Sequence, residues 1–130
     1  MFYSSDRRFK IWDYNVSHNQ LLLRSPRTPE INTNIDFVFW GVEYIDLPTS
    51  FVGISLEPPE RADMFNVERS IGKPCDISGV YCVVSGEQRH FVLASGFKVL
   101  ENQLDIFETS LYYFSGTDKK RDIGETLAHS

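Results

Sequence analysis

Asp13, Ser17 and His18 are the residue types that a serine hydrolase uses, and they lie close together in the sequence. Such an enzyme needs a serine nucleophile, a histidine base and a carboxylate that orients the base. The G-x-S-x-G motif that often carries the nucleophile does not occur. Neighbouring side chains of a strand point to opposite faces, so Ser17 and His18 could cooperate only within a turn. The alternative is a hairpin turn whose Ser17 and Asn19 side chains bond to the backbone.

Glu43 and its aromatic neighbours Trp40 and Tyr44 form the second arrangement that could do chemistry. Glycosidases place two carboxylates across a cleft, and aromatic rings beside them could stack on a sugar. The pattern therefore predicts either a cleft that binds or hydrolyses a small ligand or carbohydrate, or a Glu43 that points to solvent from the open face of a sheet.

An arginine at position 24 follows three leucines and is a candidate for binding rather than catalysis. On one interpretation, an exposed apolar patch carries a cationic anchor, as interface hot spots do. On the other, the N-terminal segment covers Leu22, and Arg24 pairs with Asp36 or Glu43. The first interpretation predicts that Arg24→Ala leaves folding nearly intact. The residues of this patch are Trp12, Tyr14, Leu22 and Arg24.

Motifs for cofactors and metals are missing from the sequence. There is no phosphate-binding G-x-x-x-x-G-K-[ST] or G-x-G-x-x-G, no H-x-H pair and no C-x-x-C. We therefore expect no cofactor, no metal and no catalytic residue. Cys82 lies in an apolar run and is expected to be an inert buried thiol. Cys75 follows Lys73, which could lower its pKa and make it reactive.

The charge of the chain is −5, which argues against a nucleic-acid partner because phosphates require a cationic surface. No apolar run approaches the ~18 residues of a membrane span, and no secretory signal opens the chain. These features predict a cytoplasmic protein without a membrane partner. Residues 1–30 carry a net +2 and residues 31–76 a net −5, which predicts either a dipolar surface suited to recognition or scattered solvated charge.

Short apolar runs rich in Val, Ile, Phe, Tyr and Trp predict an all-β fold. We expect an antiparallel sandwich or a partly open barrel of seven or eight strands, with one short helix near 59–69. The single domain is predicted over 1–115, followed by a polar and flexible tail over 116–130. The predicted strands cover 9–16, 20–25, 35–47 with a bulge at Gly41, 51–56, 77–85, 89–95 and 97–101, and 104–114 is a strand or a short helix.

The hairpin at residues 9–25, with its V-S-H-x-x-L-L-L-R-S pattern, and the segment 36–48 resemble a group of small uncharacterised bacterial proteins. The resemblance covers roughly the first 50 residues. It implies a bacterial origin and an all-β start, and it transfers no catalytic residue because the group has no assigned activity.

The function that these features favour is a non-catalytic protein-interaction domain, rather than an enzyme. It would form a homo-oligomer or bind a protein partner, for example as an immunity-like protein that neutralises a toxin. The alternative is the small-ligand or carbohydrate domain, or hydrolase, built on the cleft beside Glu43.

Overall fold

The computed structural model describes residues 1–111 and 123–130, and in this part of the chain the fold is mostly antiparallel β-sheet. Nine strands form one open sheet in the order β4-β7-β6-β5-β1-β2-β3-β8-β9. The elements are β1 (Tyr3–Asn15), β2 (Gln20–Ser25), β3 (Asn34–Trp40), β4 (Tyr44–Asp46), β5 (Ser50–Glu57), α1 (Arg61–Ile71), the 3₁₀ turn η1 (Ile77–Gly79), β6 (Val80–Ser85), β7 (Gln88–Leu93), β8 (Gly96–Asn102) and β9 (Glu125–His129). The all-β prediction with one short helix is confirmed.

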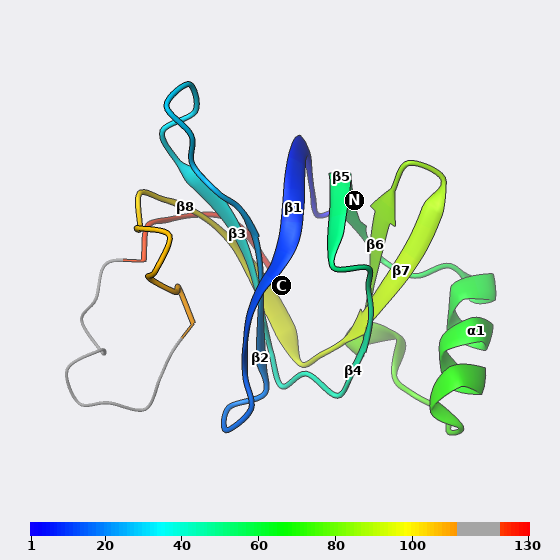
Figure 1. The fold of residues 1–130 in the computed structure, drawn as a ribbon. Helices are drawn as coiled ribbons and strands as arrows, with labels where there is room; N and C mark the ends of the chain where they lie inside the picture. The colour runs from blue at the N-terminus through cyan, green and yellow to red at the C-terminus, as the bar shows by residue number, and fades with distance from the viewer. Residues whose placement is uncertain (112–122) are drawn as a thin grey trace.

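The sheet bends at a corner, where β3 continues into β4 and β7 continues into β8. β3 pairs with β8. The next strand in the chain, β4, pairs with β7, which directly precedes β8. Two backbone hydrogen bonds continue the ladder across the corner, from Ser95 N to Trp40 O and from Glu43 N to Leu93 O. All nine strands belong to one open sheet that bends around a core, as Figure 1 shows for β1 to β8.

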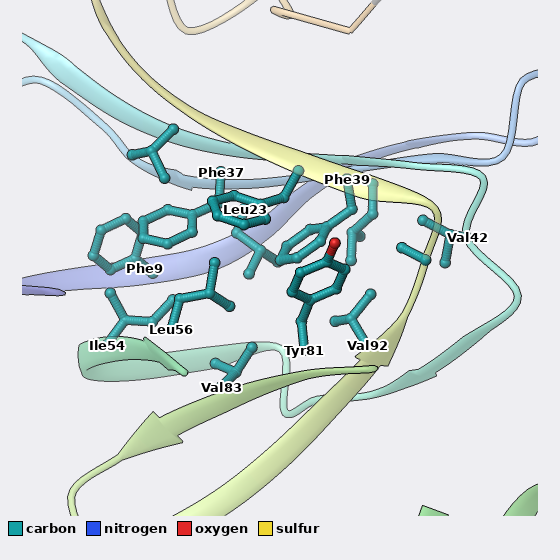
Figure 2. Packing of buried hydrophobic residues seen from close by; sticks show 14 of the residues in the cluster. Phe9, Leu23, Phe37, Phe39, Val42, Ile54, Leu56, Tyr81, Val83 and Val92 are labelled. Atoms are coloured by element: carbon teal, nitrogen blue, oxygen red, sulfur yellow. The ribbon is translucent and has the colours of Figure 1, made fainter. Parts of the chain in front are cut away.

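The core lies inside the bent sheet and is filled mainly by aromatic rings. Phe9 stands at 88° to Phe37 with ring centroids 5.3 Å apart, and Tyr81 meets Phe97 edge-on at 5.2 Å. Figure 2 shows Phe9, Phe37 and Tyr81 between the ribbons of β1, β3 and β8 on one side and β5, β6 and β7 on the other. Edge-to-face rings of this kind add to the apolar area that they bury, so one face of every long strand contributes to a single core.

Two covers protect parts of the outer face of the sheet. The helix α1 packs on β6 and β7 through Val67, which contacts the cluster of Val80, Cys82, Phe91 and Leu93 (Figure 1). The segment 104–111 lies over β2, β3 and β8, where Leu111 packs on Leu22.

Local sequence explains the ends of α1. Glu60 and Asp63 form a reciprocal capping box at its start, and Gly72 ends it with φ +76°. Glycine adopts this left-handed backbone without a steric penalty. The predicted helix near 59–69 therefore lies two residues further along the chain.

Three predicted elements differ from the structure. Gly41 has φ +61° and turns the chain toward β7, so the single strand predicted over 35–47 is two strands, β3 and β4. Residues 104–111 form a covering segment and no strand, and 112–114 lie outside the described residues. Residues 125–129 of the predicted tail form β9, which pairs with β8, while 116–122 are not described. The polar composition of β9 suits an edge strand, which sequence patterning does not separate from a tail.

Candidate functional site

The N-terminal half of β1 separates from β2 and opens a groove in the sheet. β1 pairs with β5 from Tyr3 to Lys10, but its pairing with β2 begins only at Lys10, opposite Arg24. Beyond Ser25 the chain leaves β1 and makes the connection 26–33 to β3. Figure 1 shows β1 and this connection diverging toward the top of the view.

The groove has a volume of about 370 Å³ and two chemically different walls. Arg8 and Lys10 of β1 stand on one side, and Pro26, Thr28 and Ile31 of the connection stand on the other. Arg7 and Ser25 complete the lining. A cationic wall facing a largely apolar wall is the composition of a site for a ligand with both acidic and apolar parts.

Arg7 closes the base of the groove and is already paired. Its Nη1 donates to Thr33 O at 2.8 Å, and its Nη2 lies 3.9 Å from Glu101 Oε2. Thr33 Oγ1 donates to the same carboxylate oxygen at 2.7 Å. Arg7 therefore links β1 to the start of β3 and to β8.

Tyr3 lies close to this group of residues. Burial raises the pKa of Tyr3, and the Glu101 carboxylate raises it further, so this phenol is neutral at physiological pH.

Arg8 and Lys10 are the cations that remain available to a ligand. Both side chains are exposed, and among residues 1–111 and 123–130 neither forms a hydrogen bond or an ion pair. Phe9 between them is fully buried in the core, and strand alternation therefore turns Arg8 and Lys10 to the outer face. Val52 of β5 lies opposite Arg8 and is 59% exposed.

The opposite wall is held in shape by its own hydrogen bonds. Thr28 N donates to Ile31 O at 2.6 Å, and Ile31 N donates to Thr28 Oγ1 at 3.0 Å. Arg27 N donates to Asn34 Oδ1 at 2.7 Å, which fixes the connection to the start of β3. Ile31 is nevertheless 45% exposed, so an apolar surface stays open to the groove.

Arg24 and Leu22 are buried, so the prediction of an exposed patch that includes them is wrong. Arg24 makes a bidentate pair with Asp36, and its Nη1 donates to Glu108 O at 2.8 Å. Leu111 and Ile123 pack on Leu22, so the cover comes from the C-terminal part of the chain and not from the N-terminal segment. These residues stabilise the sheet and offer no surface to a partner.

The aromatic residues of the predicted patch also have structural partners. The ring of half-buried Trp12 lies 5.5 Å from the Arg24 guanidinium, a cation–π contact within the fold. Tyr14 is 38% exposed, and its hydroxyl donates to Asn19 Oδ1 at 3.3 Å. Asn19 has φ +50°, as the hairpin prediction required. Ser17 Oγ donates to Asn15 Oδ1 at 2.8 Å, which favours the turn over a catalytic serine.

The cleft predicted around Glu43 is not assembled. Glu43 is exposed beside a shallow hollow of about 200 Å³ that includes Lys73 and Cys75. Tyr44 packs on the cluster beneath α1, and Trp40 lies against Gly96, so neither ring lines this hollow. The expected partnership of these three residues fails because Gly41 turns the chain between Trp40 and Glu43.

The two cysteines have the properties of packing residues. Burial, followed by the Glu68 carboxylate, raises the pKa of Cys75 despite the neighbouring Lys73. Burial also raises the pKa of Cys82 to about 11. A thiol reacts as its thiolate, so the suggestion of a reactive Cys75 is not supported.

No family model, curated protein or solved structure matches the chain. Within the described ranges, no helix is long and apolar enough to cross a membrane. The same ranges hold no group of three His, Cys, Asp or Glu residues that could ligate a metal ion. The chemistry of the groove therefore carries the functional argument.

Sequence reasoning missed the groove, although part of its signal was visible. The run Arg7-Arg8-Phe9-Lys10 places cations at alternate positions of a strand, and Pro26 and Pro29 mark the facing connection as irregular. Neither the cations of β1 nor the prolines of the connection predict that β1 separates from β2, because the separation depends on where β2 ends.

Proposed function

We propose that this chain is a non-catalytic protein-interaction domain whose groove between β1 and the connection 26–33 binds an acidic segment of a partner protein. The observation that carries the proposal is the pair Arg8 and Lys10, two exposed cations without an ionic partner among the described residues, opposite the apolar wall of Pro26 and Ile31. Charges at the edge of an interface select a complementary partner and speed its association.

Several features of the molecule support binding over catalysis. The chain as a whole is acidic, so a basic groove is a local exception that favours an acidic ligand over nonspecific anion binding. The raised pKa values of both thiols argue against Cys75 and Cys82 as nucleophiles. The alternative of a carbohydrate or hydrolase cleft has less support, because Glu43 is exposed and apart from the aromatic rings.

The experiment is selection of random heptapeptides displayed on phage against the immobilised full chain. We expect the wild type to enrich peptides rich in Asp and Glu, with binding that weakens as salt rises. The variant Arg8→Glu/Lys10→Glu should lose this enrichment. A matched control, Arg61→Glu/Arg69→Glu, changes the net charge equally on exposed residues of α1 and should keep it.

Two results would overturn the proposal. One is a wild type that enriches no acidic peptides, or a control variant that loses them as completely as the groove variant. The other is a wild-type dimer in native mass spectrometry that becomes a monomer in Arg8→Glu/Lys10→Glu, which would make a second copy of this chain the occupant.

A further inference from the structure

The backbone of β1 has an open edge along the groove. From Tyr3 to Phe9 this strand pairs with β5 on one side, through registers such as Tyr3 opposite Leu56 and Arg8 opposite Val52. On its other side, no described strand pairs with it before Lys10. Alternate N–H and C=O groups of a strand face each neighbour, and a β-bulge between Ser5 and Arg8 interrupts this alternation. Within the bulge, Arg7 N donates to Ser5 Oγ at 3.2 Å. The part of the edge that lines the groove itself is Arg7 to Lys10.

An open edge beside a cationic wall is suited to adding a strand. Extended peptides bind such edges through main-chain hydrogen bonds, and side chains at alternate positions supply the selectivity. Seven residues of strand span about 23 Å, which is enough for a peptide of about the same number of residues. β2 ends at Ser25, next to the groove. An added strand would therefore lie beyond Ser25, in line with β2.

The side chains of β1 define which residues this added strand would carry. Burial alternates from Tyr3 to Lys10, and the exposed positions of this stretch are Ser4, Asp6, Arg8 and Lys10. A cross-strand neighbour directly opposite Arg8 would also lie diagonally close to Lys10, so an acidic residue is favoured there. An acidic residue opposite Asp6 would be repelled. The intervening residues would face Pro26 and Ile31 and should be apolar.

We infer that the acidic partner segment binds as a β-strand, antiparallel to Tyr3–Phe9 of β1, with its acidic residues at the end next to Ser25. This inference rests on the proposed function, because it specifies how the acidic segment occupies the same groove. The antiparallel direction continues the line of β2, and every strand pair of the described sheet is antiparallel.

The test compares two capped heptapeptides, Glu-Val-Thr-Val-Thr-Val-Thr and Thr-Val-Glu-Val-Thr-Val-Thr, by fluorescence anisotropy on the full chain. The two peptides have the same composition and charge. With its first residue opposite Arg8, the first peptide places its acid opposite Arg8 and diagonally close to Lys10. We expect it to bind at least tenfold more tightly than the second, which places its acid opposite Asp6.

Backbone methylation of the first peptide then separates strand addition from simple charge attraction. Methylating the amides of one alternate set of residues removes the donors that face β1, and each lost bond should weaken binding by up to about tenfold. Methylating the other set should leave binding nearly unchanged. In hydrogen exchange, the amides of Ser4–Phe9 should become protected, whereas those of the edge strand β4 should not.

The outcomes distinguish this inference from the proposed function. Equal effects of both methylated sets, with binding still lost in Arg8→Glu/Lys10→Glu, would overturn strand addition and leave an acidic ligand in the groove. Equal affinities of the two heptapeptides would overturn the proposed register. Failure of every acidic peptide, including those from the display selection, would overturn the proposed function as well.

Discussion

The guanidinium of Arg24 and the carboxylate of Asp36 form a bidentate pair across β2 and β3, and neither side chain is exposed to solvent. Nε lies 2.7 Å from Oδ1, and Nη2 lies 2.9 Å from Oδ2. Asn102 donates to Asp36 Oδ2 at 2.9 Å, so β8 joins the same network. A buried pair of this kind has its charges satisfied within the fold.

Arg24→Ala should therefore destabilise the protein strongly, contrary to the expectation from an exposed patch. Removing the cation leaves Asp36 buried without its ionic partner, which costs about 3–5 kcal/mol of unfolding free energy. Urea unfolding followed by tryptophan fluorescence measures the loss. A change below about 1 kcal/mol, the range of surface pairs, would contradict the structural role.

The double variant Arg24→Met/Asp36→Leu is the matched control for that prediction. It removes both charges and keeps apolar volume, so it should be more stable than Arg24→Ala. Asn102 would still donate to Ile123 O at 3.1 Å. A double variant that is less stable than the single one would indicate that the charges themselves stabilise the sheet.

The contact between Asp63 of α1 and Arg89 of β7 predicts a pH dependence of stability. Arg89 donates to both Asp63 oxygens, at 3.0 and 2.7 Å, and this hydrogen bonding lowers the pKa of Asp63 from its usual 3.8. A carboxyl with a lowered pKa in the folded state adds stability above its unfolded pKa and loses it as the pH falls through the folded pKa.

We therefore expect Asp63→Asn to be less stable than the wild type at pH 7, by about 1–3 kcal/mol. The difference should shrink as the pH is lowered from about 4 toward 2, because the wild-type carboxyl then becomes protonated. Urea midpoints measured across this range test the prediction, with Arg89→Met as a second variant. A difference that stays constant with pH would contradict it.

Gly41 is required at the corner of the sheet for two separate reasons. Its φ of +61° is unfavourable for other residues, and a Cβ at this position would collide with the side chain of Ser95, whose own Cβ would be only 2.8 Å away. Gly41→Ala should cost about 1–3 kcal/mol beyond the backbone strain alone. Thermal or urea unfolding would measure this.

Gly72→Ala is the control that measures the cost of the strained backbone without a steric clash. Gly72 has φ +76°, and a Cβ there meets nothing within 4 Å, so only strain of about 1–2 kcal/mol is expected. Gly41→Ala/Ser95→Gly should recover part of the loss. Equal effects of the two alanine variants would show that the contact with Ser95 is relieved by small shifts.

The turn between β1 and β2 depends on the left-handed backbone of Asn19. Its φ is +50°, and its carbonyl oxygen accepts a hydrogen bond from Val42 N at 2.9 Å. Asn19→Val should destabilise the protein by at least about 1–2 kcal/mol, because a β-branched residue is strained there. Asn19→Gly, which tolerates this φ, should cost much less in the same urea experiment. Equal losses would assign the effect to the side chain.

Both thiols should react slowly with iodoacetamide at pH 7.5. Burial raises the pKa of Cys75, and that of Cys82 is raised to about 11, so few thiolates are present. Mass spectrometry of the alkylated chain should show Cys75 labelled more slowly than free cysteine and Cys82 labelled only in urea. A Cys75 that reacts faster than free cysteine would restore it as a candidate nucleophile.

Local patterns in the sequence determined the individual elements well. Gln20–Ser25 holds three consecutive leucines and ends before a proline, and β2 has these bounds. The acidic residues after Pro59 marked the start of α1, and Asn19 marked the hairpin. Each of these features depends on interactions within a few residues, and local hydrogen bonding and backbone preferences act over that range.

Only the tertiary structure decided which surfaces are free. Leu22 and Arg24 have the same local sequence whether they are exposed or buried, and the cover from Leu111 comes from far along the chain. The groove likewise exists because β2 ends at Ser25 while β1 continues along β5. Strand neighbours and covering segments are long-range contacts, whose free energy is shared among many residues, and therefore the periodicity of a single strand does not reveal them.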